Sequence, residues 1–227
     1  MRFLFALLLL LGGPVSAQLT GSVGAAVPLG AFGGTEVGTE DGFARPGFAA
    51  FIDLNVPLGS EQENGLAFAT TLGALVFRPN TAPYTPFPPN PEVEGVVSVG
   101  SWVVVPVLLG ARYERAVSPT LTVAPSLQAG VSVFVAPSAT YEVTSSVSQF
   151  EVVTRPQPNV GPAWSASVGL GVVLLDRLDV GARALLLSAP EITFGATRSF
   201  PTEPAANIGK RVERPIAAAS FTVGYRL

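Results

Sequence analysis

The sequence predicts an all-β chain that forms an eight-stranded antiparallel up-and-down transmembrane β-barrel. Three observations carry this prediction: apolar and polar residues alternate along eight segments, each segment is long enough to cross a bilayer, and long and short connections alternate between them. The composition agrees, since 48% of the 227 residues are hydrophobic, only 13% are charged and the mean hydropathy is +0.46. So few charges cannot cover the surface of a soluble globule, which indicates a membrane environment.

Residues 1–17 have the pattern of a secretory signal peptide. An early charge, Arg2, precedes an apolar run over residues 3–11, a Gly-Gly-Pro break and the cleavage-site residues Val15 and Ala17. The apolar run is too short to span a bilayer comfortably. We therefore expect cleavage after Ala17 and an exported outer-membrane barrel domain over residues 18–227.

Eight segments alternate with the period of two that marks a strand with two unlike faces. Their expected ranges are residues 19–27, 48–58, 66–76, 103–114, 121–133, 164–174, 178–186 and 216–227. Tilted strands of about 9 to 13 residues cross a bilayer, and an even number can close without leaving an unpaired edge. Pro106 and Pro125 fall inside two of the segments, and we expect each to mark a bulge or bend.

The connections between the segments alternate in length. Long ones cover roughly residues 29–46, 78–95, 136–162 and 189–213, and short turns follow the second, fourth and sixth segments. This is the layout of an outer-membrane barrel, with long outer loops, short periplasmic turns and both termini in the periplasm. The stretch 141–153 is suited to extend a hairpin beyond the membrane and to offer an edge to a partner.

The alternative is a soluble periplasmic or secreted β-barrel that binds a small apolar ligand. In such a barrel the polar face meets water and should be rich in Lys, Glu and Asp. Here the polar face carries mainly Ser, Thr, Gly and Ala, which fit the narrow interior of an eight-stranded barrel. The two faces therefore favour a barrel whose large apolar residues meet lipid.

A small set of charges falls on the inward face, most of them toward the periplasmic half. They are three acids and three bases: Asp53, Arg112, Glu114, Asp179, Arg183 and Arg226. A buried charge is costly unless it is paired, so we expect an ion-pair and hydrogen-bond network that plugs the lumen, with arginine giving bidentate contacts. A narrow solute channel or proton path through the lumen is the alternative.

Aromatic residues on the outward face near strand ends are candidates for the two membrane-interface girdles. They are Phe48, Tyr113, Trp164 and Tyr225. Simple packing is the alternative reading of these four residues. Phe77 and Trp102 fall on the inward face although they resemble interface aromatics, and we expect both to lie just beyond the barrel rim.

The composition excludes several kinds of chemistry. The chain contains neither histidine nor cysteine, so it cannot use thiol chemistry or the His-centred acyl transfer that some outer-membrane barrels perform. The remaining loop carboxylates are too dispersed to nominate a catalytic pair: Glu36, Glu40, Asp41, Glu92, Glu94, Glu142 and Glu151. We expect no enzymatic activity, no cofactor and no metal site.

Nucleic-acid binding is not expected either. The net charge is −3 and the chain has no run of Lys and Arg, whereas nucleic-acid binding requires a concentrated basic surface.

The chain ends in the stretch "ASFTVGYRL", which alternates apolar and other residues to its last position. Together with the signal pattern and the eight segments over residues 18–227, this ending resembles the small outer-membrane β-barrel proteins of the OmpA/OmpX and PorT-like type. The resemblance implies a monomer in outer-membrane lipid with a structural or surface-interaction role. No periplasmic domain is expected to follow the barrel.

The same resemblance implies that the last strand is a recognition signal for the barrel-assembly machinery. Four residues match the alternating pattern of such signals: Phe221, Val223, Gly224 and Tyr225. Leu227 departs from it, because phenylalanine is commoner at the final position.

Overall fold

The computed structural model describes most of the chain beyond the expected signal peptide. The described residues are 17–34, 44–58, 64–80, 93–135, 137, 139–145, 149–157, 163–188, 192–200, 203–212 and 216–227. Residues 1–16 lie outside them, so the signal peptide stays a prediction. Among the described residues, no helix is long and apolar enough to cross a membrane.

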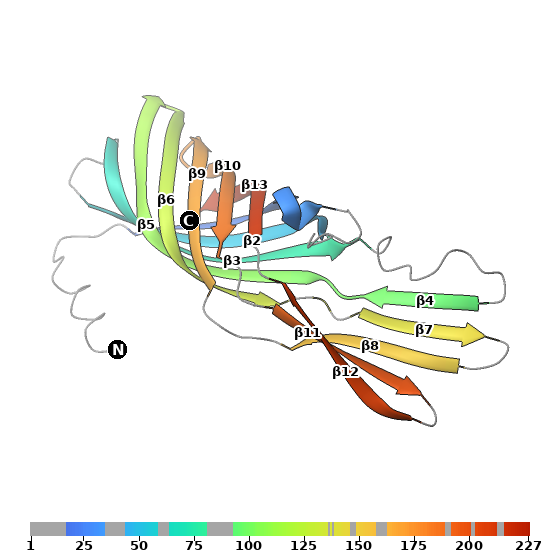
Figure 1. The fold of residues 1–227 in the computed structure, drawn as a ribbon. Coiled ribbons are helices and arrows are strands. Elements are labelled where there is room, and N and C mark those ends of the chain that lie inside the picture. The colour runs from blue at the N-terminus through green and yellow to red at the C-terminus, as the bar shows by residue number, and fades with distance from the viewer. Residues whose placement is uncertain are drawn as a thin grey trace.

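Eight long antiparallel strands close into a barrel in the order β1-β13-β10-β9-β6-β5-β3-β2 (Figure 1). Their bounds are β1 Gln18–Leu29, β2 Ala44–Pro57, β3 Asn64–Pro79, β5 Trp102–Ser118, β6 Leu121–Val135, β9 Ala163–Leu174, β10 Leu178–Leu187 and β13 Ile216–Arg226. Each coincides with one of the eight segments expected from alternation, so the predicted fold class is confirmed. The last strand closes the ring by pairing with both β1 and β10.

A bulge or a bend was expected at each of the two internal prolines, and neither proline marks a bulge. Pro106 interrupts the β3–β5 pairing between Leu72↔Val107 and Leu75↔Val104, and the register is the same on both sides. Pro125 lies in a similar interruption of the β5–β6 pairing. A proline removes one ladder hydrogen bond, and strands this long retain enough pairs on either side to keep their register.

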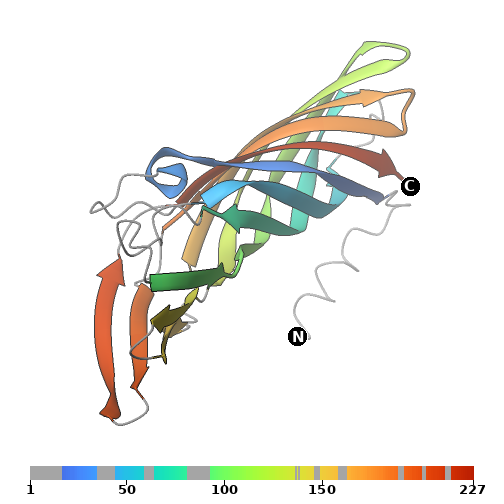
Figure 2. The same cartoon turned by 90° about the vertical axis from the view of Figure 1, so that its right-hand side faces the viewer.

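Five further strands form a second sheet, in the order β12-β11-β8-β7-β4. Their bounds are β4 Val93–Val99, β7 Ala139–Ser145, β8 Gln149–Gln157, β11 Ile192–Phe200 and β12 Glu203–Val212. In Figure 2 this sheet projects from one end of the barrel, and the C-terminus lies at the other end. Four of the strands fall within the long connections 136–162 and 189–213, and β4 begins within the connection 78–95. Of these connections, only the stretch 141–153 was expected to extend a hairpin.

The order of this sheet repeats the order of the barrel. Along the chain β4 leads into β5, β7 follows β6, β8 leads into β9, β11 follows β10 and β12 leads into β13. The sheet order β4-β7-β8-β11-β12 therefore matches the barrel order β5-β6-β9-β10-β13. Five adjacent barrel strands thus have a continuation outside the barrel, whereas the described residues show none for β1, β2 and β3.

The barrel exterior is apolar. Large hydrophobic side chains on alternate positions are exposed on every barrel strand, for example Val23, Ile52, Leu127, Val168 and Phe221. A soluble monomer rarely exposes so continuous an apolar surface. The exterior is that of a barrel that meets hydrocarbon, as the outward parity predicted.

The barrel interior is divided into two halves. The half toward the five-stranded sheet is filled by large apolar side chains: Phe32, Phe51, Leu75, Phe77, Trp102, Val104, Leu108, Phe134, Leu187 and Ile216. The other half holds the buried charged residues Asp53, Arg112 and Asp179, together with polar residues such as Thr20 and Gln128. Only the polar half was anticipated from the inward parity.

Candidate functional site: the filled lumen and its aromatic closure

The six predicted lumen charges all lie inside the barrel, and each has an oppositely charged partner. Arg112 is central to the first group, with Nη2 2.7 Å from Asp179 Oδ2 and Nε 3.0 Å from Glu114 Oε1. The Glu114 carboxylate also accepts hydrogen bonds from both terminal nitrogens of Arg226, at 2.5 Å from Nη2 and 3.3 Å from Nη1. A chain of alternating charges therefore runs from β10 through β5 to β13.

A second group extends from Arg183 on β10. Its Nη2 lies 2.8 Å from Asp53 Oδ1, and its guanidinium carbon lies 4.4 Å from the centre of the Phe51 ring. Thr71 donates its hydroxyl hydrogen to Asp53 and accepts a hydrogen bond of 2.9 Å from Gln128 Nε2. This group links β10 to β2, β3 and β6, and Phe51 connects it to the apolar half of the lumen.

The exposure of the side chains determines how much these ion pairs contribute to the stability of the barrel. The side chains of Arg112 and Asp179 are only 8% and 9% exposed. At such burial, removing one partner leaves an uncompensated charge and typically costs about 3–5 kcal/mol, far more than a surface pair. The two groups therefore fasten opposite walls of the barrel to one another.

A cavity of about 30 Å³ lies between the two groups. Thr20, Asp53, Arg112, Asp179 and Arg183 are among its lining residues. Within the described residues, Thr20 Oγ1 and Arg183 Nη1 are buried without a protein partner. A polar cavity of this size has room for one or two water molecules, not for a solute.

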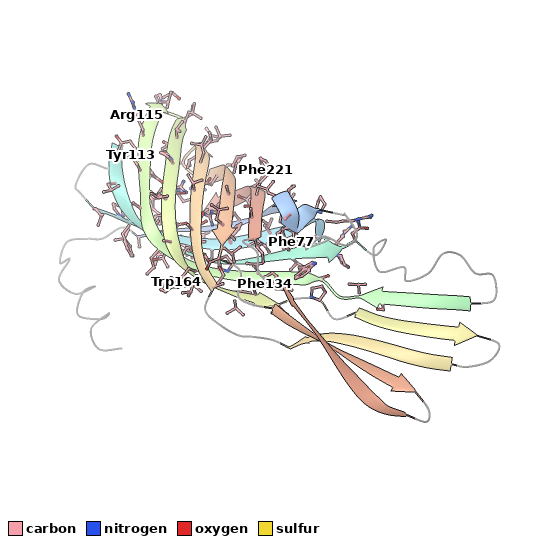
Figure 3. The ribbon with its side chains drawn as sticks, viewed as in Figure 1. Phe77, Tyr113, Arg115, Phe134, Trp164 and Phe221 are labelled. Atoms are coloured by element: carbon pink, nitrogen blue, oxygen red, sulfur yellow. The ribbon has the colours of Figure 1, made fainter. Side chains whose placement is uncertain are left out.

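The other half of the lumen is closed by an aromatic cluster. Directly after β1 the 3-10 turn η1, Gly30–Gly33, carries Phe32 into the mouth of the barrel. Its ring packs edge-on against Phe77 at 5.1 Å and Trp102 at 5.6 Å, and Phe134 stacks on Trp102 at 5.3 Å. Figure 3 shows Phe77 and Phe134 at the end of the barrel near the five-stranded sheet.

The backbone of η1 explains how Phe32 reaches this position. Gly30 has φ +57°, a left-handed conformation that suits glycine and turns the chain back over the opening. The turn starts from β1, which is four positions from β6 around the ring, so Phe32 crosses the mouth to meet Phe134 on the opposite wall. We call Phe32, Phe77, Trp102 and Phe134 the aromatic plug.

The aromatic plug corrects one expectation and adds a residue that sequence reasoning missed. Phe77 and Trp102 do not lie beyond the rim; they are 0% and 6% exposed inside the barrel. Their inward parity was the correct signal. Phe32 had no such signal, because it follows the last alternating residue of β1 and its position depends on a turn of the backbone.

The predicted interface aromatics all point outward. Phe48, Tyr113, Trp164 and Tyr225 are 44% to 70% exposed. Tyr113 lies near the end of the barrel far from the five-stranded sheet, and Trp164 lies nearer to the sheet (Figure 3). Tyr225 accepts a hydrogen bond of 3.1 Å from Arg177, which lies in the β9–β10 turn.

The residues of the expected assembly signal lie on β13 and at its end. Phe221, Val223, Tyr225 and Leu227 are exposed on the outward face, and Gly224 faces inward against Ser22 of β1. The Leu227 N–H donates to the carbonyl oxygen of Leu19 at 2.8 Å, so the pairing with β1 reaches the last residue.

The loop carboxylates form no metal site among the residues that the structure describes. Within those ranges no group of three or more His, Cys, Asp and Glu lies together. Glu36, Glu40, Asp41 and Glu92 lie outside the described residues. Glu94, Glu142 and Glu151 lie on β4, β7 and β8, where Glu142 and Glu151 are cross-strand partners.

The closed antiparallel ring, apolar exterior and filled interior define a small β-barrel of the outer-membrane type, the architecture of OmpA/OmpX-type proteins. An interior occupied from wall to wall separates it from the wide porins, which enclose an aqueous channel.

Of the comparisons with known proteins, only the one with solved structures finds similar chains. No protein-family model matches the chain, and no curated protein matches it. Among solved structures, Ail, the attachment invasion locus protein of Yersinia pestis, is similar over 93% of this chain and 99% of its own, with 10% identity and a TM-score of 0.38. Neisserial surface protein A is similar over 93% and 96%, with 11% identity and a TM-score of 0.44. At these values the likenesses carry no argument about activity, and the fold class rests on the strand pairing of the chain itself.

Proposed function

We propose that this chain is an exported, integral outer-membrane protein without catalysis, which presents its five-stranded sheet outside the membrane as a docking surface for another protein. One observation carries the proposal: five adjacent barrel strands have continuations that pair in the same order beyond the barrel. The barrel holds this sheet at the membrane surface, and its interior is filled so that nothing passes through.

The membrane part of the proposal is supported by the exterior. Leu127 and Trp164 are 67% and 70% exposed on the outward face. In the alternative soluble barrel, such residues would face a ligand in the interior. The observed interior instead holds paired charges and an aromatic plug.

The docking part is supported by two open edges. Within the described residues, β4 pairs only with β7, and β12 pairs only with β11. An open edge has unpaired backbone groups to which an extended segment of a partner can add as a further strand. The β12 sequence contains Pro204, Lys210 and Arg211, which protect an edge, whereas β4 has the sequence VEGVVSV with a single charge. We therefore assign docking to the edge of β4.

The docking test compares the full chain with a deletion variant that inserts into the outer membrane equally well. In the variant, short turns replace residues 81–100, 136–162 and 189–215, which removes all five strands of the outer sheet, β4 included, but keeps the barrel strands. Cells that display the full chain should bind a panel of immobilised extracellular proteins more than cells that display the variant. Equal binding by the two would contradict a docking role, provided both migrate as heat-modifiable bands in detergent gels.

The narrow-channel alternative has a direct test. The aromatic plug and the paired charges close the two halves of the lumen independently. Planar bilayers containing the wild type or Arg183→Ala should therefore carry no current, because the aromatic plug remains in both. A single-channel current from either protein would support the channel instead.

A further inference from the structure

Two arginines lie side by side at the rim of the barrel next to the five-stranded sheet. Arg45 on β2 and Arg78 on β3 are direct partners in the β2–β3 ladder. Their chain neighbours Ala44 and Phe77 are 3% and 0% exposed in the interior, whereas both arginines are exposed. Because side chains alternate along a strand, both guanidinium groups are on the outward face.

The backbone is shaped to hold this pair together. The β2–β3 register shifts between Arg45 and Phe48, which marks a bulge, and bulges at barrel rims redirect side chains. Gly47 lies within the bulge, where an added Cβ would come within 1.9 Å of the carbonyl oxygen of Val76. A side chain at this position would push β2 away from β3.

The two arginines have no anionic partner in the described part of the chain. Arg45 Nη2 donates to Asn80 Oδ1 at 2.7 Å, and Asn80 is only 4% exposed. Among the described residues, Arg78 forms neither a hydrogen bond nor an ion pair through its side chain. Like charges directly opposite each other on neighbouring strands destabilise a sheet, so the arrangement favours a bound anion.

The depth of the pair indicates where that anion lies. The outward face of β3 runs from Leu66 to Val76, which is ten residue steps, and the next outward residue is Arg78. Ten steps of about 3.4 Å at a tilt of about 45° span about 24 Å, close to the height of the apolar band of such barrels. The guanidinium groups therefore lie where hydrocarbon ends and lipid headgroups begin.

We propose that Arg45 and Arg78 together bind one phosphate of a phosphorylated lipid headgroup in the outer leaflet. Each guanidinium offers a planar fork of donors that matches a phosphate. Directly opposed residues on neighbouring strands have Cβ atoms about 5 Å apart, so both forks can reach the same group. Asn80 holds one fork in place, and the phosphate neutralises the repulsion between them. The site rests on the proposed membrane orientation.

The test uses the full chain in nanodiscs of zwitterionic lipid with a small share of a phosphomonoester lipid. The number of phosphomonoester lipids retained by the protein is counted by native mass spectrometry. The double variant Arg45→Gln/Arg78→Gln should bind this lipid about tenfold more weakly or worse, because it loses two charge-assisted contacts. The variant Arg45→Lys/Arg78→Lys keeps the two charges but not the planar guanidinium groups. The amount of lipid that it retains should fall between the amounts retained by the wild type and by the double glutamine variant.

Arg115→Gln is the matched control. Arg115 is an exposed arginine at the opposite end of the barrel (Figure 3), and its replacement should leave lipid retention unchanged. Equal retention by the wild type and the double glutamine variant would overturn the site. Displacement of the lipid by millimolar inorganic phosphate would show a soluble-anion site and would also overturn it. Failure of the wild type to enter bilayers would instead overturn the proposed membrane function.

Discussion

Glu114 on β5 and Arg226 on β13 meet across the full width of the barrel. The two strands are four positions apart around the eight-stranded ring, so they lie on opposite walls. The contact is bidentate, and the same carboxylate also holds Arg112. One acid thus balances two arginines in a place that water hardly reaches.

Glu114→Gln should lower the free energy of unfolding by about 3–5 kcal/mol, because it leaves the guanidinium groups of buried Arg112 and half-buried Arg226 without their shared carboxylate. Urea unfolding in lipid vesicles measures the change. The control is Asp176→Asn in the exposed β9–β10 turn, where φ is +59° and asparagine is well tolerated. That control should stay within about 0.5 kcal/mol of wild type; equal effects at the two positions would contradict the bracing role of Glu114.

Gly24→Ala should destabilise the seam where the barrel closes. A Cβ at Gly24 would lie 1.8 Å from the carbonyl oxygen of Phe221, a backbone atom that cannot move without separating β1 from β13. We expect a loss of about 1–3 kcal/mol and a lower temperature for the heat-induced shift on gels. Gly21→Ala is the matched control on the same strand, since no atom lies within 4 Å of its added Cβ. A Gly24 variant as stable as the Gly21 variant would mean that the seam is looser than described.

Phe32→Ala should cost about 3–5 kcal/mol, as for other buried phenylalanines, because it removes the centre of the aromatic plug. Phe32→Leu preserves most of the volume and should cost less than about 1.5 kcal/mol. Chemical unfolding of both variants gives the comparison. If alanine and leucine proved equivalent, Phe32 would not be packed inside the barrel in bilayers.

The two tryptophans provide a test of inside and outside. Trp102 is 6% exposed within the barrel, and Trp164 is 70% exposed on its exterior. In vesicles with brominated acyl chains, Trp102→Phe leaves Trp164 alone, and its fluorescence should be strongly quenched. Trp164→Phe leaves Trp102, which should be quenched much less. Equal quenching, or quenching of Trp102 alone, would contradict the assignment of the two faces.

Most of the barrel could be predicted from the sequence, because alternation records which face of a strand meets lipid. The inward positions of Asp53 and Arg183 followed from parity alone. Their pairing did not, since β2 and β10 are not neighbours in the ring and their relative height depends on the stagger of every strand between them. The same holds for Arg112 with Asp179.

Two residues that lie outside strict alternation were missed by sequence reasoning. Phe32 lies in a turn, and Arg45 comes before a bulge that changes the parity of β2. The five-stranded sheet was only partly anticipated, in the stretch 141–153. Its strands are short, and their order depends on the barrel strands that they continue rather than on their own composition.

The continuation of barrel strands into the outer sheet has a mechanical consequence. From β4 the described backbone passes through Gly100 and Ser101 directly into β5. A partner bound at the edge of β4 and pulled away from the cell would load this strand lengthwise. The hydrogen bonds of an antiparallel ladder lie perpendicular to the strands, so those of β5 would share the force and resist it together in shear, instead of parting one after another. The barrel would then serve as the anchor of a tether under tension.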